Sequence, residues 1–187
     1  AADAEAARIS AIEQALAEGR AVYLTRELPG LAERWSLSAV GPLIRVNPAD
    51  EQIAPEPSIV RNTPVTPEIT LRGYDLSRPS HTGQGPAPVR LSLVWVVEAQ
   101  IQTDLKVSAR LLDPAGEVVA VTDAGPVHFA YPTSRWRLGE TVTDGYTLDL
   151  PPDLPGGTYT PLIIWYDPAQ EAAEVGRVEL EPISLGQ

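Results

Sequence analysis

The chain has 187 residues, 43% of them hydrophobic, and a formal net charge of −11; it is not a disordered chain, and it is long enough to fold without a metal or disulfide staple. The lack of cysteine excludes disulfides, thiolate nucleophiles and Cys-ligated metal sites. The acidic balance argues against nucleic acid or anionic lipid as a partner, and no apolar run reaches the roughly 18 residues that direct membrane insertion requires.

Residues 3–18 are predicted to form a helix. Ile9, Ile12 and Leu16 are spaced so that they share one face, and Gly19 stands where a helix C′ residue is expected. The β-rich run 21–25 follows, and residues 38–46 predict a second strand, which Gly41-Pro42 interrupts or bulges. Residues 1–46 are therefore expected to form a small N-terminal α/β segment with one helix and two strands.

Residues 47–67 contain five prolines and show no periodicity. Each proline removes a backbone donor and biases the residue before it away from helix. This range is predicted to be an extended linker, or a strap laid along the surface of a domain.

From residue 68 onward the pattern is that of β-strands. Short runs with alternating apolar residues are separated by turn signals and by the loop 77–88, without helices between them. The predicted strands are 69–72, 89–97, 105–111, 117–122, 141–150, 158–166 and 176–180. Asp113-Pro114-Ala115-Gly116 is a type I turn signal that should close a hairpin. Residues 68–187 are therefore predicted to be an antiparallel β-sandwich, Ig-like or jelly-roll, which makes the whole chain mainly β.

The charge is unevenly distributed between these parts. Residues 1–48 carry six acidic residues against five arginines, a net charge of −1, whereas the remaining residues carry 19 acidic and nine basic residues, a net charge of −10. Because the acidic residues are scattered rather than grouped, they are interpreted as a solvated surface that keeps the β region soluble.

No catalytic or metal-binding motif stands out. Ser134, His128 and Asp123 could form a Ser-His-Asp set, but Ser134 lacks the G-x-S-x-G context. The two histidines, His81 and His128, lack metal-ligand spacing. A carboxylate pair for glycoside hydrolysis or a calcium site remains open as an alternative, whereas acidic residues such as Asp104, Asp113, Asp123, Asp144 and Asp167 are more simply turn or cap residues. We expect no cofactor and no metal.

Aromatic residues are better candidates for binding. Trp95 and Tyr159 belong to inward-facing alternations and are predicted to be core, and one of Trp165 and Tyr166 must point away from it. Three aromatic residues and one histidine in loop-like segments are the candidate ligand-binding or partner-binding residues: Trp35, Tyr131, Trp136 and His128. Exposed Trp and Tyr offer flat platforms for sugars or proteins, while the alternative is that they fold back as plugs over the ends of the sandwich.

Several runs within residues 89–168 resemble a known module. They include VRLSLVW, LLDPAGE, PTSRWRLGE and LPPDLPGGTY, followed by YDP. Together they resemble the C-terminal β-sandwich module of large multi-pass bacterial membrane proteins, which look like glycosyltransferases of the protein O-mannosyltransferase type and are often known only as domains of unknown function. The run RAVYLTRELPGLAERWSLSAVGPLIRV also looks like the soluble segment that precedes such a module.

The resemblance implies an extracytoplasmic domain without catalytic residues of its own, tethered through a membrane part outside this chain. The sequence contains no methionine, and this fits a chain cut from a longer protein. The implied role is accessory: recognition of carbohydrate or of a partner protein, with a glycan or the membrane-embedded part of the same protein as partner. A purely structural or protein-interaction module and a small hydrolase are the alternatives, and the oligomeric state is open.

Overall fold

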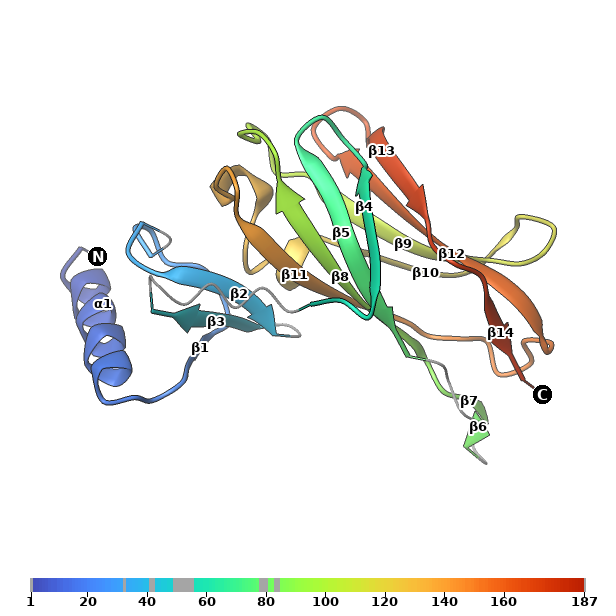
Figure 1. Ribbon diagram of the computed structural model, residues 1–187, viewed down its shortest axis with the longest axis horizontal. Helices are drawn as coiled ribbons and strands as arrows, with labels where there is room; N and C mark the ends of the chain where they lie inside the picture. The colour runs from blue at the N-terminus through green and yellow to red at the C-terminus, as the bar shows by residue number, and fades with distance from the viewer. Residues whose placement is uncertain are drawn as a thin grey trace.

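A computed structural model describes residues 2–31, 33–40, 43–48, 56–77, 81–82 and 85–186, without the side chains of residues 2–3, 39–40, 81–82 and 85–86. The molecule is elongated, with the N-terminal unit at one end and a larger β-sandwich at the other (Figure 1). Among the described residues, no helix is long and apolar enough to cross a membrane. Gly41-Pro42, the side chain of His81 and residues 49–55 of the proline-rich stretch lie outside the described residues.

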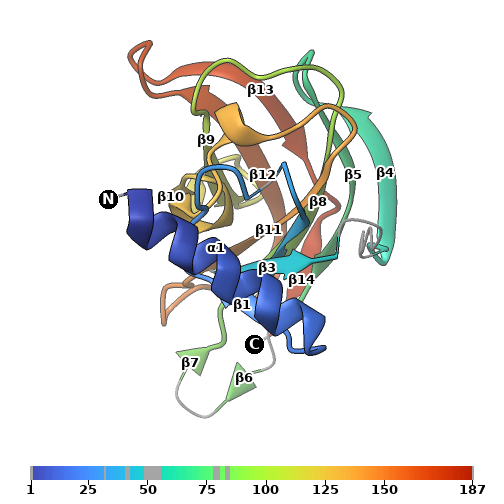
Figure 2. The ribbon, with the colours of Figure 1, turned by 90° about the vertical axis from the view of Figure 1, so that its left-hand side faces the viewer.

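The N-terminal unit is one helix packed beside a small antiparallel sheet. Its elements are α1 (Ala2–Ala17), β1 (Val22–Leu24), β2 (Ser36–Val40) and β3 (Leu43–Asn47), with strand order β1-β3-β2. The helix lies across this sheet when the molecule is viewed from its N-terminal end (Figure 2). The predicted strand 38–46 is in fact two paired strands, so the unit has three strands rather than the expected two.

The helix ends as the sequence predicts. Gly19 adopts a left-handed conformation, with φ of 73°. Its N–H donates to the carbonyl of Leu16 at 2.9 Å, and the next N–H, of Arg20, donates to the carbonyl of Ala15 at 2.9 Å. This pair of bonds is the Schellman motif, which needs a residue that tolerates positive φ at C′.

The rest of the chain is an antiparallel β-sandwich, as predicted. One sheet has the order β11-β8-β5-β4 and the other the order β10-β9-β12-β13, with β14 paired to β12. The strands are β4 (Ile59–Pro64), β5 (Ile69–Leu76), β8 (Val89–Val97), β9 (Lys106–Leu112), β10 (Val118–Ala124), β11 (Thr141–Leu148), β12 (Gly157–Asp167), β13 (Ala173–Glu179) and β14 (Ile183–Leu185). Two short strands, β6 (His81–Thr82) and β7 (Gly85–Pro86), form a hairpin between β5 and β8.

The sandwich begins earlier in the chain than residue 68. Strand β4 lies within the range predicted as linker or strap, but it pairs with β5 and so belongs to the sheet. Strands β4 and β5 pack so closely at Gly73 that a side chain would not fit there. A Cβ on Gly73 would lie 2.2 Å from the carbonyl oxygen of Ile59. The prolines around β4 removed the sequence signal of a strand. Proline is nevertheless tolerated in β4 because this strand lies at the edge of its sheet.

The predicted hairpin after β9 is confirmed. Asp113 accepts hydrogen bonds through Oδ1 from the backbone N–H groups of Ala115, at 2.8 Å, and Glu117, at 2.9 Å. Gly116 takes the left-handed conformation, with φ of 84°. The aspartate side chain thus satisfies the donors of the turn, and β9 continues directly into β10.

Three tryptophans form the centre of the sandwich core. Trp95 of β8 meets Trp165 of β12 edge-to-face, with 5.1 Å between ring centroids, and Trp136 meets Trp165 at 5.8 Å. Each of the three side chains is 0% exposed. Tyr166 is only half-buried on the opposite face of β12, as the alternation of strand side chains requires.

The core of the N-terminal unit continues into that of the sandwich. Ile12 of α1, Leu37 of β2 and Trp95 all belong to a single cluster of buried hydrophobic residues. Strand β2 runs close to β11, and β3 approaches the short 3₁₀ turn η1 (Pro126–Phe129). The chain is therefore one packed body, in which the N-terminal unit covers one end of the sandwich (Figures 1 and 2).

Candidate functional site

Most of the predicted binding residues lie in one loop, residues 125–140, which we call the junction loop. It connects β10 to β11 and contains η1 and a second 3₁₀ turn, η2 (Thr133–Arg135). Tyr131 and Trp136 come from this loop, but they are only 2% and 0% exposed. Their expected role as surface platforms is therefore wrong for this structure: they fold inward as plugs, because the sandwich end would otherwise leave Trp165 uncovered.

Trp136 and Tyr131 hold each other in place. The indole Nε1 of Trp136 donates to the carbonyl of Tyr131 at 3.1 Å, and the two rings lie 6.4 Å apart. Thr133 ties the loop to the sandwich, because its Oγ1 donates to the carbonyl of Thr103 at 2.7 Å and accepts from the N–H of Leu105 at 2.8 Å. The loop is thus a packed part of the core rather than a mobile surface segment.

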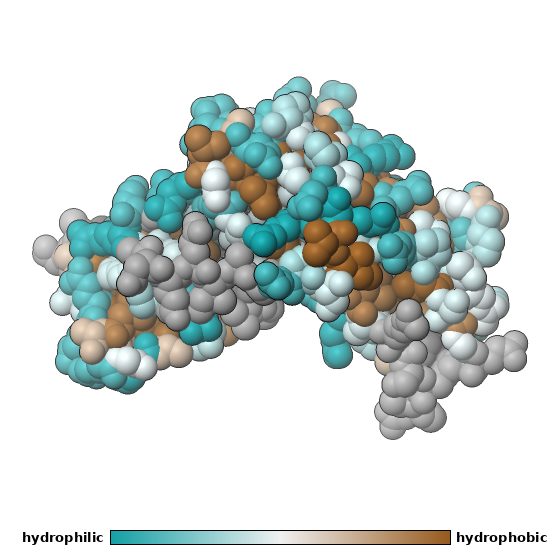
Figure 3. All heavy atoms as spheres, viewed as in Figure 1, coloured by the Kyte–Doolittle hydropathy of each residue, from teal (hydrophilic) through white to brown (hydrophobic). Residues whose placement is uncertain are grey.

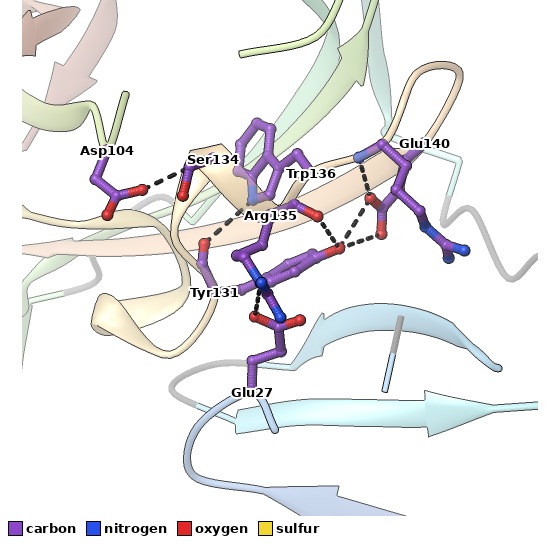
Figure 4. Close-up of polar contacts among 8 residues, drawn as sticks. Glu27, Asp104, Tyr131, Ser134, Arg135, Trp136 and Glu140 are labelled. Carbon is purple, nitrogen blue, oxygen red and sulfur yellow. Dashed lines mark hydrogen bonds and ion pairs between the residues drawn. The ribbon is translucent and has the colours of Figure 1, made fainter. Parts of the chain in front are cut away.

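The half-buried carboxylate of Glu140 accepts a hydrogen bond from the Tyr131 hydroxyl. Tyr131 Oη lies 2.9 Å from both carboxylate oxygens of Glu140 and 3.3 Å from the carbonyl of Arg135 (Figure 4). The N–H of Arg137 donates to Glu140 Oε2 at 2.9 Å. Burial raises the pKa of Glu140 above its ordinary value, and burial together with the Glu140 charge raises the pKa of the Tyr131 hydroxyl.

The N-terminal unit is attached to this loop by polar contacts. Glu27 donates its backbone N–H to the carbonyl of Ala130 at 2.8 Å, and its carboxylate accepts from Arg135 Nε at 3.2 Å (Figure 4). Arg137 reaches the carbonyl of Trp35 at 3.3 Å. Burial raises the pKa of Glu27, although the Arg135 guanidinium partly opposes this shift. Trp35 itself is half-buried and packs against the shared core.

The first turn of the junction loop is left-handed. Val127, His128 and Phe129 have φ of 53°, 51° and 65°. This conformation costs roughly 1–2 kcal/mol for each residue other than glycine, and it persists only where the surroundings impose it. Val127 is 0% exposed, whereas Phe129 is 61% exposed and lies beneath Lys106 Nζ at 5.5 Å. With this left-handed backbone, the side chain of Val127 points into the core, whereas His128 and Phe129 are exposed to solvent.

A buried aspartate fixes this turn. Asp144 of β11, which is 1% exposed, accepts the N–H of Val127 at 2.9 Å, the N–H of Gly145 at 2.9 Å and the hydroxyl of Tyr146. Burial raises the pKa of Asp144 to about 6, although these hydrogen bonds favour its charged form. The expectation that Asp144 is a turn or cap residue is wrong, because it lies within a strand and faces inward.

His128 lines a groove on the sandwich. The groove has a volume of about 470 Å³ and is bounded by β5, β8, β11 and the left-handed turn; we call it the His128 groove. Its polar lining residues are Asp75, Ser77, Arg90, Ser92, His128, Thr143, Asp144 and Thr147. The Oγ1 of Thr143 is buried without a hydrogen-bond partner among the described residues. Of the four predicted residues, His128 is exposed and Trp35 is half-buried, whereas Tyr131 and Trp136 are covered.

The Ser-His-Asp alternative finds no support in the positions of its members. Ser134 donates its backbone N–H to Asp104 at 3.2 Å, and Asp123 lies exposed on β10. In the described part of the chain, no group of three or more His, Asp or Glu side chains could hold a metal ion. Asp167 accepts the backbone N–H of Ala169, as a turn residue is expected to. Asp104 instead accepts the N–H of Ser134, which lies 30 positions further along the chain.

Sequence reasoning missed Glu27, Glu140, Asp144 and Arg90. Glu140 stands in the quoted run PTSRWRLGE, directly before β11, and this was the one available signal for its role. The others carry no local signal, because their function depends on partners that are distant in sequence. Arg135 and Glu27, for example, are separated by 108 positions.

Comparisons with known proteins give little beyond the fold. No protein-family model matches the chain, and no curated protein matches it. Among solved structures, the chain is similar to a β-glucuronidase from glycoside hydrolase family 2, with 12% sequence identity and a TM-score of 0.46. The match covers 60% of this chain and 11% of that chain. A similarity this distant carries no functional argument.

Proposed function

We propose that this chain is a non-catalytic accessory module that recognises carbohydrate through the His128 groove, as part of an extracytoplasmic, membrane-tethered protein resembling a glycosyltransferase. The observation that carries the binding role is the groove itself, with its mixed lining and the exposed, unpaired side chains of Arg90 and His128. The placement and the parent protein rest on the sequence runs of residues 89–168 alone.

The groove offers both donors and acceptors. Arg90 and His128 have no side-chain partner among the described residues, and Ser92 and Thr147 contribute hydroxyl groups. Asp75 already accepts the hydroxyl and the N–H of Ser58. Asp144 also lines the groove, but its carboxylate is buried and held by three hydrogen bonds. One guanidinium is therefore accompanied by the half-buried carboxylate of Asp75, so the groove has no strong excess of positive charge. Such a mixed lining suits the hydroxyl groups of a neutral sugar.

A non-catalytic role is supported by the contacts of the three carboxylates whose pKa values are raised by burial. Glu140 is held by Tyr131 and Arg137, Glu27 by Arg135, and Asp144 by three hydrogen bonds. Each carboxylate joins one part of the molecule to another. We therefore assign them to structure rather than to acid–base chemistry.

Calorimetric titration with a panel of neutral oligosaccharides tests the binding role. Arg90→Ala should weaken the affinity of a bound sugar by about tenfold or more, because it removes a guanidinium that can donate hydrogen bonds to sugar hydroxyl groups. Arg72→Ala is the matched control, because Arg72 lies in β5 and lines a different groove. Absence of binding across the panel, or equal losses for the two variants, would contradict the proposal.

The placement has its own test. In intact cells that produce the longer parent protein, an added protease should digest this module if it lies outside the membrane. Protection from the protease until the cells are lysed would refute the extracytoplasmic placement and leave the sugar-binding result unaffected.

A further inference from the structure

A second groove lies at the other end of the molecule, between α1 and the end of β1; we call it the α1 groove. Its floor is apolar and consists of Ala11, Ile12, Leu24 and Leu28, while Arg8 and Arg26 stand at its rim. It has a volume of about 390 Å³ and adjoins a second hollow that shares both arginines. Apolar residues lie among hydrophilic ones at this end of the molecule (Figure 3).

The two rim arginines differ from their neighbours in having no partner. In the same unit, Arg20 pairs with Glu18 at 2.7 Å, and Arg34 pairs with Glu13 at 2.9 Å. Arg8 and Arg26 are exposed, and neither makes a side-chain hydrogen bond or ion pair within the described part of the chain. Glu5 lines the adjoining hollow, and Glu27 also reaches it but is paired with Arg135. Two positive charges are therefore available at the rim.

This positive rim stands out against the charge of the whole chain. The net charge is −11, and ten of these negative charges belong to residues after 48. The sandwich repels an acidic group, whereas residues 1–48 are nearly neutral, with a net charge of −1. At the rim of the α1 groove, the guanidinium groups of Arg8 and Arg26 can bind carboxylates in bidentate geometry. The groove thus combines charge selection at its rim with apolar contact on its floor.

We propose that the α1 groove binds an acidic segment of a partner protein, in which Asp or Glu residues flank an apolar side chain. The carboxylates pair with Arg8 and Arg26, and the apolar side chain rests on Ile12 and Leu28. The floor is built from only four side chains. This short floor matches one or two residues of a peptide better than the long chain of a lipid. The α1 groove is independent of the His128 groove, so either can function without the other.

Fluorescence anisotropy with two labelled peptides tests this interaction. The first peptide has the sequence Glu-Leu-Leu-Glu between neutral glycine–serine flanks, and the second replaces both glutamates by lysine. We expect the acidic peptide to bind and the basic one not to bind. The double change Arg8→Gln with Arg26→Gln should weaken binding by at least tenfold, and raising the salt concentration should weaken it further.

Arg20→Gln with Arg34→Gln is the matched control, because it removes two charges from the same unit outside the groove. The melting temperature of both double variants checks that each remains folded. Absence of binding by the acidic peptide, or equal losses for both double variants, would overturn the proposal. Binding of dodecanoate or of anionic vesicles in place of the peptide would also overturn it and assign the groove to an amphiphile.

Discussion

The N-terminal unit and the sandwich belong to one core, but they contribute very differently to it. The sandwich closes two sheets around fully buried tryptophans, whereas among the described side chains of α1 only Ile12 is buried. A unit of fewer than 50 residues rarely buries enough apolar surface to fold alone. The comparison indicates that the N-terminal unit takes its stability from the sandwich, through the junction loop.

The two regions also differ in the type of contact that holds them. Inside the sandwich the contacts are aromatic and aliphatic, centred on Trp95 and Trp165. At the junction, hydrogen bonds and ion pairs of Glu27, Glu140 and Arg137 accompany the apolar packing. The pH of the solution should therefore affect the carboxylates that hold the junction loop, including Asp144 of β11, more than the aromatic and aliphatic core.

Removing Trp136 should cause the largest loss of stability. Its side chain is fully buried and packs on Trp165 while it also covers the end of the sandwich. Trp136→Ala should lower the free energy of unfolding by about 3–5 kcal/mol, the usual cost of a large cavity. Urea unfolding followed by circular dichroism measures this loss, and a single transition is expected because both units share one core.

Trp35→Ala is the control for that experiment. Trp35 is only half-buried and lies in the N-terminal unit, so its removal should cost clearly less. A larger loss for Trp35→Ala, or two separate unfolding transitions in the unmodified chain, would contradict the view that the N-terminal unit depends on the sandwich.

The same contrast explains what could be predicted from the sequence. Alternation in 89–97 and 105–111 identified β8 and β9, because a strand with one buried face repeats every two residues. The Asp113–Gly116 signal located the hairpin for a similarly local reason. Strand β4 was missed because it is an edge strand among prolines, and β14 because three residues are too few to show a pattern.

The site was less predictable, for a physical reason. Whether Tyr131 and Trp136 point outward or inward depends on packing against the end of the sandwich. The local sequence around these residues carries no information about that packing. The left-handed conformation of Val127 is against the preference of a β-branched residue, and the distant Asp144 imposes it. Only His128 could be found from its loop position, and its groove arises from strands that are remote in the sequence.

Mild acid should stabilise the protein. The pKa of Asp144 is raised from 3.8 to about 6 by burial, so the folded state binds this proton more tightly than the unfolded state. This contribution is fully present below pH 4 and is lost as the pH rises through about 6, because stability falls with pH wherever the folded state holds more protons. For this one group the difference is about 2–3 kcal/mol, and the raised pKa values of Glu27 and Glu140 act in the same direction.

Unfolding in urea at pH 5 and pH 7.5 measures this effect. Asp144→Asn removes the titrating group and keeps its shape, so the difference between the two pH values should shrink. Asp75→Asn, at a half-buried position of β5, serves as the comparison and should reduce the difference less. Higher stability at pH 7.5 than at pH 5 would show that the buried carboxylate is not destabilised by its surroundings.

The smallest expected loss of stability comes from removing one tyrosine hydroxyl, either in the junction loop or in the sandwich. Tyr131→Phe removes the hydrogen bond to the half-buried Glu140 carboxylate and should cost about 1.5–3 kcal/mol, because bonds to charged groups are the stronger ones. Tyr159→Phe removes a bond of 2.7 Å to the carbonyl of Pro155 in the sandwich and should cost about 0.5–1.5 kcal/mol. Both rings remain in place, so chemical denaturation of the two variants compares only the hydrogen bonds. Equal losses would mean that the Glu140 charge adds nothing, and the junction would then be held by packing, as the sandwich is.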